Sequence, residues 1–314
     1  MFKIGSLVFS HGLIQGPLAG FSCSPFRESF SAYQMPDYCV SEMISAHDVL
    51  YKHAPGSRYL HRSTKEGILC YQLSGTKADE LAAAASKLEA LGADLIDINC
   101  GCPKPKIRKK GAGSALLENP ANLLHMIRQV KSEISIPLTV KIRIQDREKD
   151  KQLTLAIQEA GADALIVHGR TYRDDYNKPC DYQAIAHIKS YLQIPVIANG
   201  DIYDTASLMK AYQETGCDAL MISRAGCGRP WLYQHLMFGE KKILLSECLD
   251  VFKQHVMALS DLEGEFQALI QSRSLMKYYF RGIFAVEAFF DCLDLEDMLR
   301  KVEHKVIELC AQRY

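Results

Sequence analysis

The sequence has no net charge and no long apolar run, and both absences restrict what the protein can do. Its 37 Lys and Arg residues balance its 37 Asp and Glu residues, so any nucleic-acid binding has to come from local basic patches. No apolar stretch approaches the roughly 20 residues that a membrane-spanning helix needs. The N-terminus also lacks the apolar segment of a secretory signal. We therefore expect a cytoplasmic protein without a membrane partner.

Paired cysteine spacing and a dinucleotide-binding fingerprint are missing as well. The 11 cysteines form no C-x-x-C pair, and the closest two are Cys100 and Cys102. This pattern predicts reduced thiols and no metal site. No G-x-G-x-x-G follows the first expected strand. An open doubly wound sheet is therefore the less favoured of two α/β folds.

Short apolar strands alternate with helices about eight times over the first ~225 residues, which is the rhythm of a (β/α)8 TIM barrel. The expected strands cover residues 13–20, 38–43, 67–73, 95–98, 137–143, 164–170, 195–201 and 219–224. Three similar turns, at 92–94, 161–163 and 216–218, each lead from a helix into a strand. This repetition favours one closed barrel over two separate domains.

Beyond Trp231 the strand pattern stops and helical periodicity continues to the end of the chain. The expected helices cover 248–259, 266–284 and 295–310. We predict a barrel domain over residues 1–240 and a C-terminal all-helical domain over residues 241–314.

The most distinctive stretch is Asp97-Ile98-Asn99-Cys100-Gly101-Cys102-Pro103, an apolar strand that runs into a turn with two thiols. A strongly basic segment follows, with Lys104, Lys106, Arg108, Lys109 and Lys110. Ligands and chemistry gather at the carboxyl ends of parallel strands. A cysteine here is a candidate acid or nucleophile. A buried structural thiol is about equally compatible with this stretch taken alone.

Polar residues recur where the expected strands end, and in a barrel those ends converge on one mouth. They are Gln72, Asn99, Cys102, Lys141, Arg143, His168, Asn199, Asp201 and Arg224. The last two strands are followed by tight turns at 199–201 and 223–226. This position often binds phosphate through backbone N–H groups. The pattern predicts one site that holds a phosphate-bearing cofactor.

Several motifs occur in a specific order along the chain. They are Pro17-Leu18-Ala19-Gly20, Gln72, Asn99-Cys100-Gly101-Cys102-Pro103, Gly111-Ala112-Gly113-Ser114-Ala115-Leu116, Val140-Lys141-Ile142-Arg143, His168-Gly169-Arg170-Thr171, Asn199-Gly200-Asp201 and Ser223-Arg224. In this order they resemble the tRNA-dihydrouridine synthase family, and most closely its bacterial B-type branch. The resemblance covers essentially the whole barrel.

The resemblance implies a bound FMN, NADPH as reductant and tRNA as substrate. Reduced flavin would deliver hydride from N5 to C6 of uracil, and Cys102 would protonate C5. An ordinary thiol, with a pKa of about 8.5, is mostly protonated at neutral pH and suits a general acid. The residues implied for FMN binding are Pro17, Leu18, Ala19, Gln72, Asn99, Lys141, His168, Asn199, Gly200, Asp201, Ser223 and Arg224.

Basic residues in two places are candidates for RNA contact. One group, Lys104, Lys106, Arg108 and Lys109, follows the proposed acid, and Arg143 lies at the end of a strand. The other group, Arg273, Lys277 and Arg281, is spaced by four residues on an expected helix, which predicts a cationic stripe. A solvated charged surface is the alternative for each group. We expect a monomer that binds tRNA through both domains.

Three positions depart from the family's usual residues. Leu18 replaces Met, Ser223 replaces Gly, and Ser274-Leu275 replaces a Lys-His pair. Two other classes of function also stay open. One is a small-molecule FMN oxidoreductase of the dihydroorotate dehydrogenase or ene-reductase type, which needs neither the basic segment nor the helical tail. The other is a protein without catalysis, which binds RNA or assists its folding and keeps the barrel as a platform.

Overall fold

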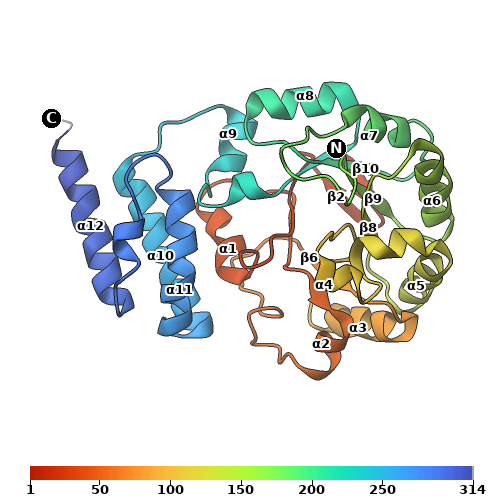
Figure 1. Cartoon of the computed structure of the whole chain (residues 1–314), viewed down its shortest axis with the longest axis horizontal. Coiled ribbons are helices and arrows are strands. Elements are labelled where there is room, and N and C mark those ends of the chain that lie inside the picture. Colours follow the sequence, from red (N-terminus) through yellow and green to blue (C-terminus); the bar gives the residue numbers. More distant parts are fainter. Residues whose placement is uncertain (313–314) are drawn as a thin grey trace.

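Eight parallel strands close into a barrel in this computed structural model, which describes residues 1–312 (Figure 1). The strands are β3 (Leu13–Gln15), β4 (Tyr38–Val40), β6 (Leu69–Ser74), β7 (Leu95–Cys100), β8 (Leu138–Arg143), β9 (Ala164–His168), β10 (Val196–Asn199) and β11 (Ala219–Ile222). Neighbours in the order β4-β3-β11-β10-β9-β8-β7-β6 are paired, and the β4–β6 pairing closes the ring. A short extra strand, β5 (Ile44–Ser45), pairs with the end of β6. The predicted TIM barrel is confirmed.

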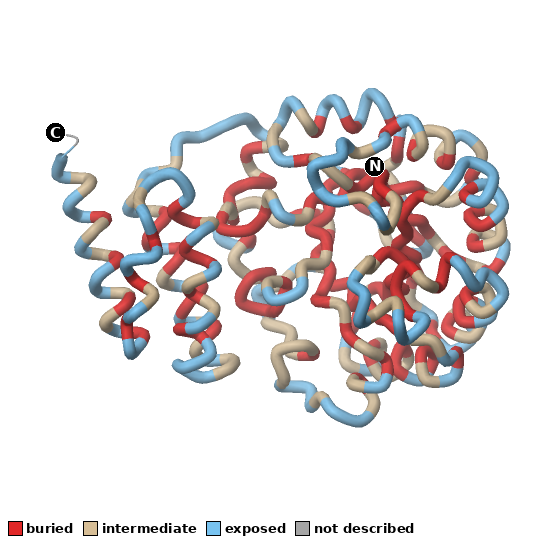
Figure 2. Tube along the Cα trace, viewed as in Figure 1, coloured by how far each residue is buried: buried red, intermediate tan, exposed pale blue. Residues whose placement is uncertain are grey.

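Helices surround the barrel, with their buried residues turned toward the strands (Figure 2). They are α1 (Ser24–Glu28), η1 (Ser29–Ala32), α2 (Ala46–Tyr51), α3 (Ala78–Ala90), α4 (Pro105–Arg108), η2 (Gly113–Glu118), α5 (Pro120–Glu133), α6 (Arg147–Glu159), α7 (Tyr182–Lys189), α8 (Thr205–Thr215), η3 (Arg224–Gly226) and α9 (Leu232–Phe238). The short helix α4 lies in the basic segment after Cys102. No helix among residues 1–312 is both long and apolar enough to cross a membrane.

A hairpin of β1 (Phe2–Ile4) and β2 (Leu7–Phe9) fills the amino end of the barrel. Its buried Ile4 and Phe9 belong to the same apolar cluster as Ile14, Tyr38 and Leu95, which lie near the amino ends of strands. Burying these side chains removes apolar surface from water, which stabilises this end. The polar strand ends lie at the opposite, carboxyl end.

Aspartates in the repeated turns tie each helix to two strands. A carboxylate accepts a hydrogen bond from the backbone N–H at or next to the start of a neighbouring strand, from Leu69 to Asp94 (2.8 Å), from Leu138 to Asp163 (2.7 Å) and from Val196 to Asp218 (2.7 Å). Each carboxylate also pairs with a cation, namely Arg62, Lys131 and Lys189 in the same order. These turns therefore satisfy backbone donors that the barrel would leave unpaired.

The C-terminal segment is helical, as predicted, and lies beside α1 (Figure 1). It contains α10 (Leu245–Glu263), α11 (Glu265–Tyr279), η4 (Glu287–Phe289) and α12 (Leu295–Ala311). Because α11 ends at Tyr279, the expected helix 266–284 is too long, and Arg281 lies beyond it. The proposed domain boundary at residue 240 falls between α9 and α10 and stays a prediction.

Polar contacts of the barrel residues Tyr33 and Arg58 join the helical segment to the barrel. The Tyr33 hydroxyl donates to Glu247 of α10 (2.8 Å). Arg58 pairs with Glu42 of the barrel (2.7 Å) and with Glu263 at the end of α10. One guanidinium thus bridges carboxylates on both sides of the junction.

Replacing Asp163 by alanine tests the role of the turn aspartates. Asp163→Ala leaves the Leu138 N–H without its acceptor, so the free energy of unfolding should fall by about 1–3 kcal/mol. Urea titration followed by circular dichroism measures the change. Asp250→Ala on the exposed side of α10 is the control and should change stability little. Equal stability of the Asp163→Ala and wild-type proteins would contradict this role.

Candidate active site

Five polar side chains from consecutive strands β6 to β10 are buried together at the carboxyl end of the barrel. They are Gln72, Asn99, Lys141, His168 and Asn199, each less than a tenth exposed. Buried polar groups are costly unless they are hydrogen-bonded. Here the Lys141 ammonium donates to Asn199 Oδ1 (2.8 Å), and Asn99 Nδ2 donates to Gln72 Oε1 (2.9 Å). Four of these buried polar groups are therefore hydrogen-bonded in two pairs, one that joins β8 to β10 and one that joins β6 to β7.

Asn99 holds the turn that carries Cys102. Its Oδ1 accepts hydrogen bonds from the backbone N–H of Gly101 (3.2 Å) and of Cys102 (3.0 Å). The Cys102 carbonyl accepts from the Ser114 N–H in η2 (3.0 Å). A Cβ added at Gly113 would lie 2.8 Å from that carbonyl, so η2 can approach only with glycine there. The turn is held from both sides.

The two neighbouring thiols differ sharply in access. Cys102 is partly exposed, whereas Cys100 is fully buried in the apolar core. Burial raises the pKa of the Cys100 thiol well above its ordinary value. Of these two cysteines, only Cys102 is accessible to a ligand at the mouth.

The mouth is strongly cationic around a neutral imidazole. Burial and the nearby charges of Lys141, Arg143, Arg170 and Arg224 lower the pKa of His168 to about 2. Burial also lowers the pKa of Lys141, while Asp97 opposes that shift. His168 is therefore uncharged at neutral pH and can accept a hydrogen bond at one ring nitrogen. An anionic ligand fits such a surrounding.

The turn after β10 is shaped by an ion pair that the sequence analysis did not assign. Arg170 is buried and binds the Asp201 carboxylate (2.7 Å), which also accepts from the Cys180 N–H (2.8 Å). Asp201 has a φ of +51°, and Gly200 has a φ of +131°. A Cβ at Gly200 would lie 2.7 Å from the Cys180 sulfur. Asp201 therefore shapes the turn through Arg170.

The turns after β3 and β11 form the remaining part of the rim. Pro17 and Leu18 are partly exposed and Ala19 is exposed. The Leu18 N–H donates to the Ser22 hydroxyl (2.8 Å), which holds this turn in place. Ser223 is partly exposed, and the exposed Arg224 lies 3.9 Å from the centre of the Tyr176 ring. Arg224 can therefore reach a ligand from the rim.

Two arginines expected to contact substrate are engaged within the protein. Arg108 bonds to Ser114 (2.9 Å) and to Glu118 (2.7 Å), and it stacks on Tyr172 at 3.7 Å. Arg143 donates to the carbonyls of Gly101 (2.9 Å) and Thr171 (2.8 Å). Both side chains tie neighbouring loops of the mouth together. Lys104, Lys106 and Lys109 are exposed and form no ion pair within residues 1–312.

The expected cationic stripe on α11 is not continuous. Arg273 is partly buried, and Lys277 lies over the Phe290 ring at 5.2 Å. Arg281 lies outside the helix and over the Tyr278 ring at 5.2 Å. The prediction of three cations on one helical face is wrong, because the helix ends two residues before Arg281.

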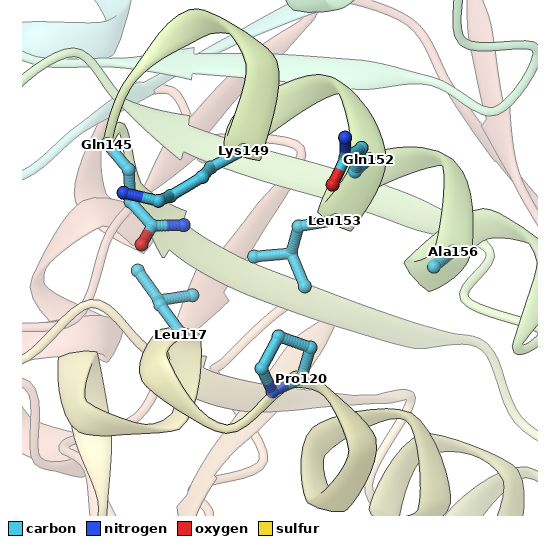
Figure 3. A pocket seen from close by; sticks show the side chains of 7 residues that line it. All are labelled: Leu117, Pro120, Gln145, Lys149, Gln152, Leu153 and Ala156. Carbon is cyan, nitrogen blue, oxygen red and sulfur yellow. The ribbon is translucent and has the colours of Figure 1, made fainter.

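Two surface hollows of about 180 Å³ each lie outside the mouth. In one, Leu117 and Pro120 face Leu153 of α6, with Gln145 and Lys149 at the edge (Figure 3). The other lies between Phe21 of the barrel and α11, and its lining includes Ser274 and Leu275. The two residues that depart from the family's Lys-His pair thus line the junction with the helical segment.

The chain was compared with known proteins. The family model described as dihydrouridine synthase (Dus) matches residues 14–311. The chain belongs to the dihydrouridine synthase family. It is 34% identical to tRNA-dihydrouridine synthase B of Vibrio cholerae, with 94% of this chain and 95% of that protein covered. It is 32% identical to a probable tRNA-dihydrouridine synthase of Helicobacter pylori, with 96% and 92% covered.

Two solved structures with low sequence identity to this chain share its barrel fold. Morphinone reductase superposes with a TM-score of 0.55 at 12% identity, covering 76% of this chain and 90% of that chain. A 2-naphthoyl-CoA reductase superposes with a TM-score of 0.59 at 11% identity, covering 76% and 52%. These likenesses support the fold. The expected family and its enzyme class are confirmed by the matches to the family model and to the bacterial relatives.

Sequence reasoning missed two buried charged residues of this site. The motif His168-Gly169-Arg170-Thr171 assigns no role to Arg170, and Asp97 lies within an apolar strand whose pattern gives it none. Asp97 is 1% exposed and accepts hydrogen bonds from Thr139 (2.6 Å) and Gln72 (2.8 Å). A charged residue within an apolar strand was the available signal, because such a charge has to be paired.

Alkylation tests the difference between the two thiols. Native protein treated with iodoacetamide should be modified at Cys102 at least about tenfold faster than at Cys100, because only an accessible thiolate reacts. Peptide mass spectrometry measures the two rates. Cys310, also partly exposed, is the positive control, and unfolded protein should lose the difference. Equal native rates would contradict the assigned burial.

Proposed function

We propose that this enzyme uses bound FMN and NADPH to reduce specific uridines of tRNA to 5,6-dihydrouridine. The observation that carries the proposal is the partly exposed Cys102 thiol at the carboxyl end of the barrel, beside a cationic polar network. The whole-length similarity to bacterial tRNA-dihydrouridine synthases supports the same reaction and substrate. The B-type relatives favour a uridine in the D-loop.

The residues at the mouth fit FMN. Lys141 and Arg224 supply positive charge for an anionic phosphate and for an electron-rich reduced ring. The neutral His168 can bond the ribityl or phosphate oxygens without adding a titrating charge. The remaining contacts proposed for FMN are those of Pro17, Leu18, Ala19, Gln72, Asn99, Asn199, Gly200, Asp201 and Ser223. Reduced FMN, regenerated with NADPH, would supply the hydride that reaches C6 of uracil.

Cys102 would complete the reduction as the general acid. Addition of hydride at C6 leaves negative charge at C5 and O4 of the uracil, and the Cys102 sulfur would transfer its proton to C5. Asn99 orients the backbone of that turn through Gly101 and Cys102. A uridine stacked in folded tRNA cannot reach the mouth. It must therefore be extruded, at a cost of a few kcal/mol.

The three exposed lysines after Cys102 are suited to hold the RNA. Lys104, Lys106 and Lys109 are exposed and lie close in sequence to the proposed acid. Neutralisation of phosphates by such cations supplies much of RNA affinity. Arg108 and Arg143 would act mainly by holding the loops of the mouth. Arg273, Lys277 and Arg281 stay weaker candidates for RNA contact. The monomeric state and the cytoplasmic location stay predictions.

A small-molecule reductase is the alternative, because morphinone reductase shares the barrel fold. That activity would not need α10 to α12 or the exposed lysines. Oxidation of NADPH by the purified, flavin-loaded protein separates the two functions. Turnover that depends on unmodified tRNA supports the proposal, and turnover with small enones but without tRNA overturns it.

Replacing each thiol tests the assigned acid. Cys102→Ala should reduce dihydrouridine formation by about 10²-fold or more, within the usual range for removing a general acid, while NADPH still reduces the flavin. Cys100→Ala should stay within about threefold, because only a small buried cavity results. Mass spectrometry of digested tRNA measures the product. Loss of activity in Cys100→Ala alone would reverse the assignment.

Removing the exposed lysines tests the RNA surface. The triple variant Lys104→Ala, Lys106→Ala, Lys109→Ala should bind tRNA more weakly, with the slope of log affinity against log salt reduced by about 2–3. Filter binding over a salt series measures the slope. The matched control removes the exposed Lys3, Lys151 and Lys210 and should leave the slope nearly unchanged. Equal slopes in both triple variants would remove this surface from the proposal.

A further inference from the structure

Asp97 is a buried carboxylate in the middle of β7 to which the reaction described above gives no role. Its side chain is 1% exposed, and both of its oxygens are bonded. Thr139 Oγ1 donates to one oxygen (2.6 Å), and Gln72 Nε2 donates to the other (2.8 Å). Burial raises the pKa of Asp97, while these two donors and Lys141 favour the ionised form. An apolar strand does not need such a costly group for packing.

The carboxylate dictates which way the neighbouring amides face. Both Asp97 oxygens accept in the structure, one from the Thr139 hydroxyl and the other from Gln72 Nε2, so the Gln72 NH₂ group faces Asp97. The Gln72 oxygen then faces Asn99 and accepts from Asn99 Nδ2 (2.9 Å). The Asn99 oxygen is thereby left to accept the backbone N–H of Gly101 and Cys102 (3.2 and 3.0 Å).

Both ends of this chain of hydrogen bonds demand the same direction. Both oxygens of Asp97 at one end accept hydrogen bonds, and the backbone N–H groups of Gly101 and Cys102 at the other end can only donate. Reversing either amide would place two donors or two acceptors against each other within a buried site. The orientation of the Asn99 amide is therefore supported from both ends, directly by the Gly101 and Cys102 N–H groups and, through Gln72, by Asp97.

We propose that Asp97 is a positioning residue, which orients the Gln72 and Asn99 amides and through them holds the Cys102 turn. The proposal rests on the function assigned above to Cys102. Within residues 1–312, each amide NH₂ group makes one bond of this chain, from Gln72 to Asp97 and from Asn99 to Gln72.

Hydrogen exchange tests this chain without any need for turnover. In Asp97→Ala, the N–H groups of Gly101 and Cys102 should exchange about tenfold faster, because their acceptor is no longer held. Asp97→Asn should exchange nearly as slowly as wild type. Its oxygen can still accept from Gln72 while its NH₂ faces the Thr139 hydroxyl, which can accept. Exchange measured by mass spectrometry on flavin-loaded protein resolves the 100–104 segment.

Two further variants distinguish faster exchange at the Cys102 turn from a general loss of protein stability. Asp150 is another buried carboxylate, and it accepts from the Gln145 N–H (3.0 Å), outside the site. Asp150→Ala should speed exchange at Gln145 but not at Gly101 and Cys102. Gln72→Met breaks the chain in its middle while retaining the buried charge, and it should reproduce the faster exchange at Cys102. It also tests the proposal if Asp97→Ala fails to fold.

The rates of uridine reduction in these variants should change in the same order as their exchange rates. Asp97→Ala should lower the single-turnover rate of uridine reduction about tenfold or more with tRNA affinity unchanged, whereas Asp97→Asn should recover most of it. Unchanged exchange at Cys102 in both Asp97→Ala and Gln72→Met overturns the proposal, as does equal impairment of Asp97→Asn and Asp97→Ala. If the variants show the expected exchange pattern but wild-type protein does not reduce uridine, the proposed function is overturned and the positioning role stands.

Discussion

The site depends on one contact, in which the Asn99 side-chain oxygen receives the backbone N–H groups of Gly101 and Cys102. Strand β7 ends at Cys100, so these N–H groups lie beyond the last ladder pairing. Without the Asn99 oxygen they would be donors without an acceptor near a largely buried mouth. The contact satisfies them and at the same time determines where the next thiol lies.

Electrostatics at the mouth contrast with the rest of the molecule. The whole chain is formally neutral, yet Lys141, Arg143, Arg170 and Arg224 act together on His168. Of these, Arg170 is paired with Asp201, and Arg143 is bonded to backbone carbonyls. Of these four cations, Lys141 and Arg224 are therefore left to interact with an anion. The local concentration of positive charge therefore favours an anionic ligand at this site, although the chain as a whole is neutral.

The scaffold keeps this polar end separate from the apolar end. The hairpin residues Ile4 and Phe9 fill the amino end, and the turn aspartates satisfy backbone donors at or beside the starts of strands β6, β8 and β10. On the side of the helical segment, Glu42 accepts from the Gly20 N–H (2.6 Å) and from Arg58, which also pairs with Glu263. The first loop of the mouth is thus connected to α10 through one arginine.

The sequence by itself determined the alternation of strands and helices, the helical tail and the family, because these depend on local periodicity and on motifs contiguous in the chain. Only the tertiary structure decided which thiol is accessible, since Cys100 and Cys102 are separated by a turn that breaks strand alternation. It also showed that Arg108 and Arg143 bond within the protein and that α11 ends before Arg281. The bond between Gln72 and Asp97 joins residues 25 positions apart. This pairing arises from the parallel register of β6 and β7, which places Gln72 opposite Asp97, and no local pattern in the chain encodes it.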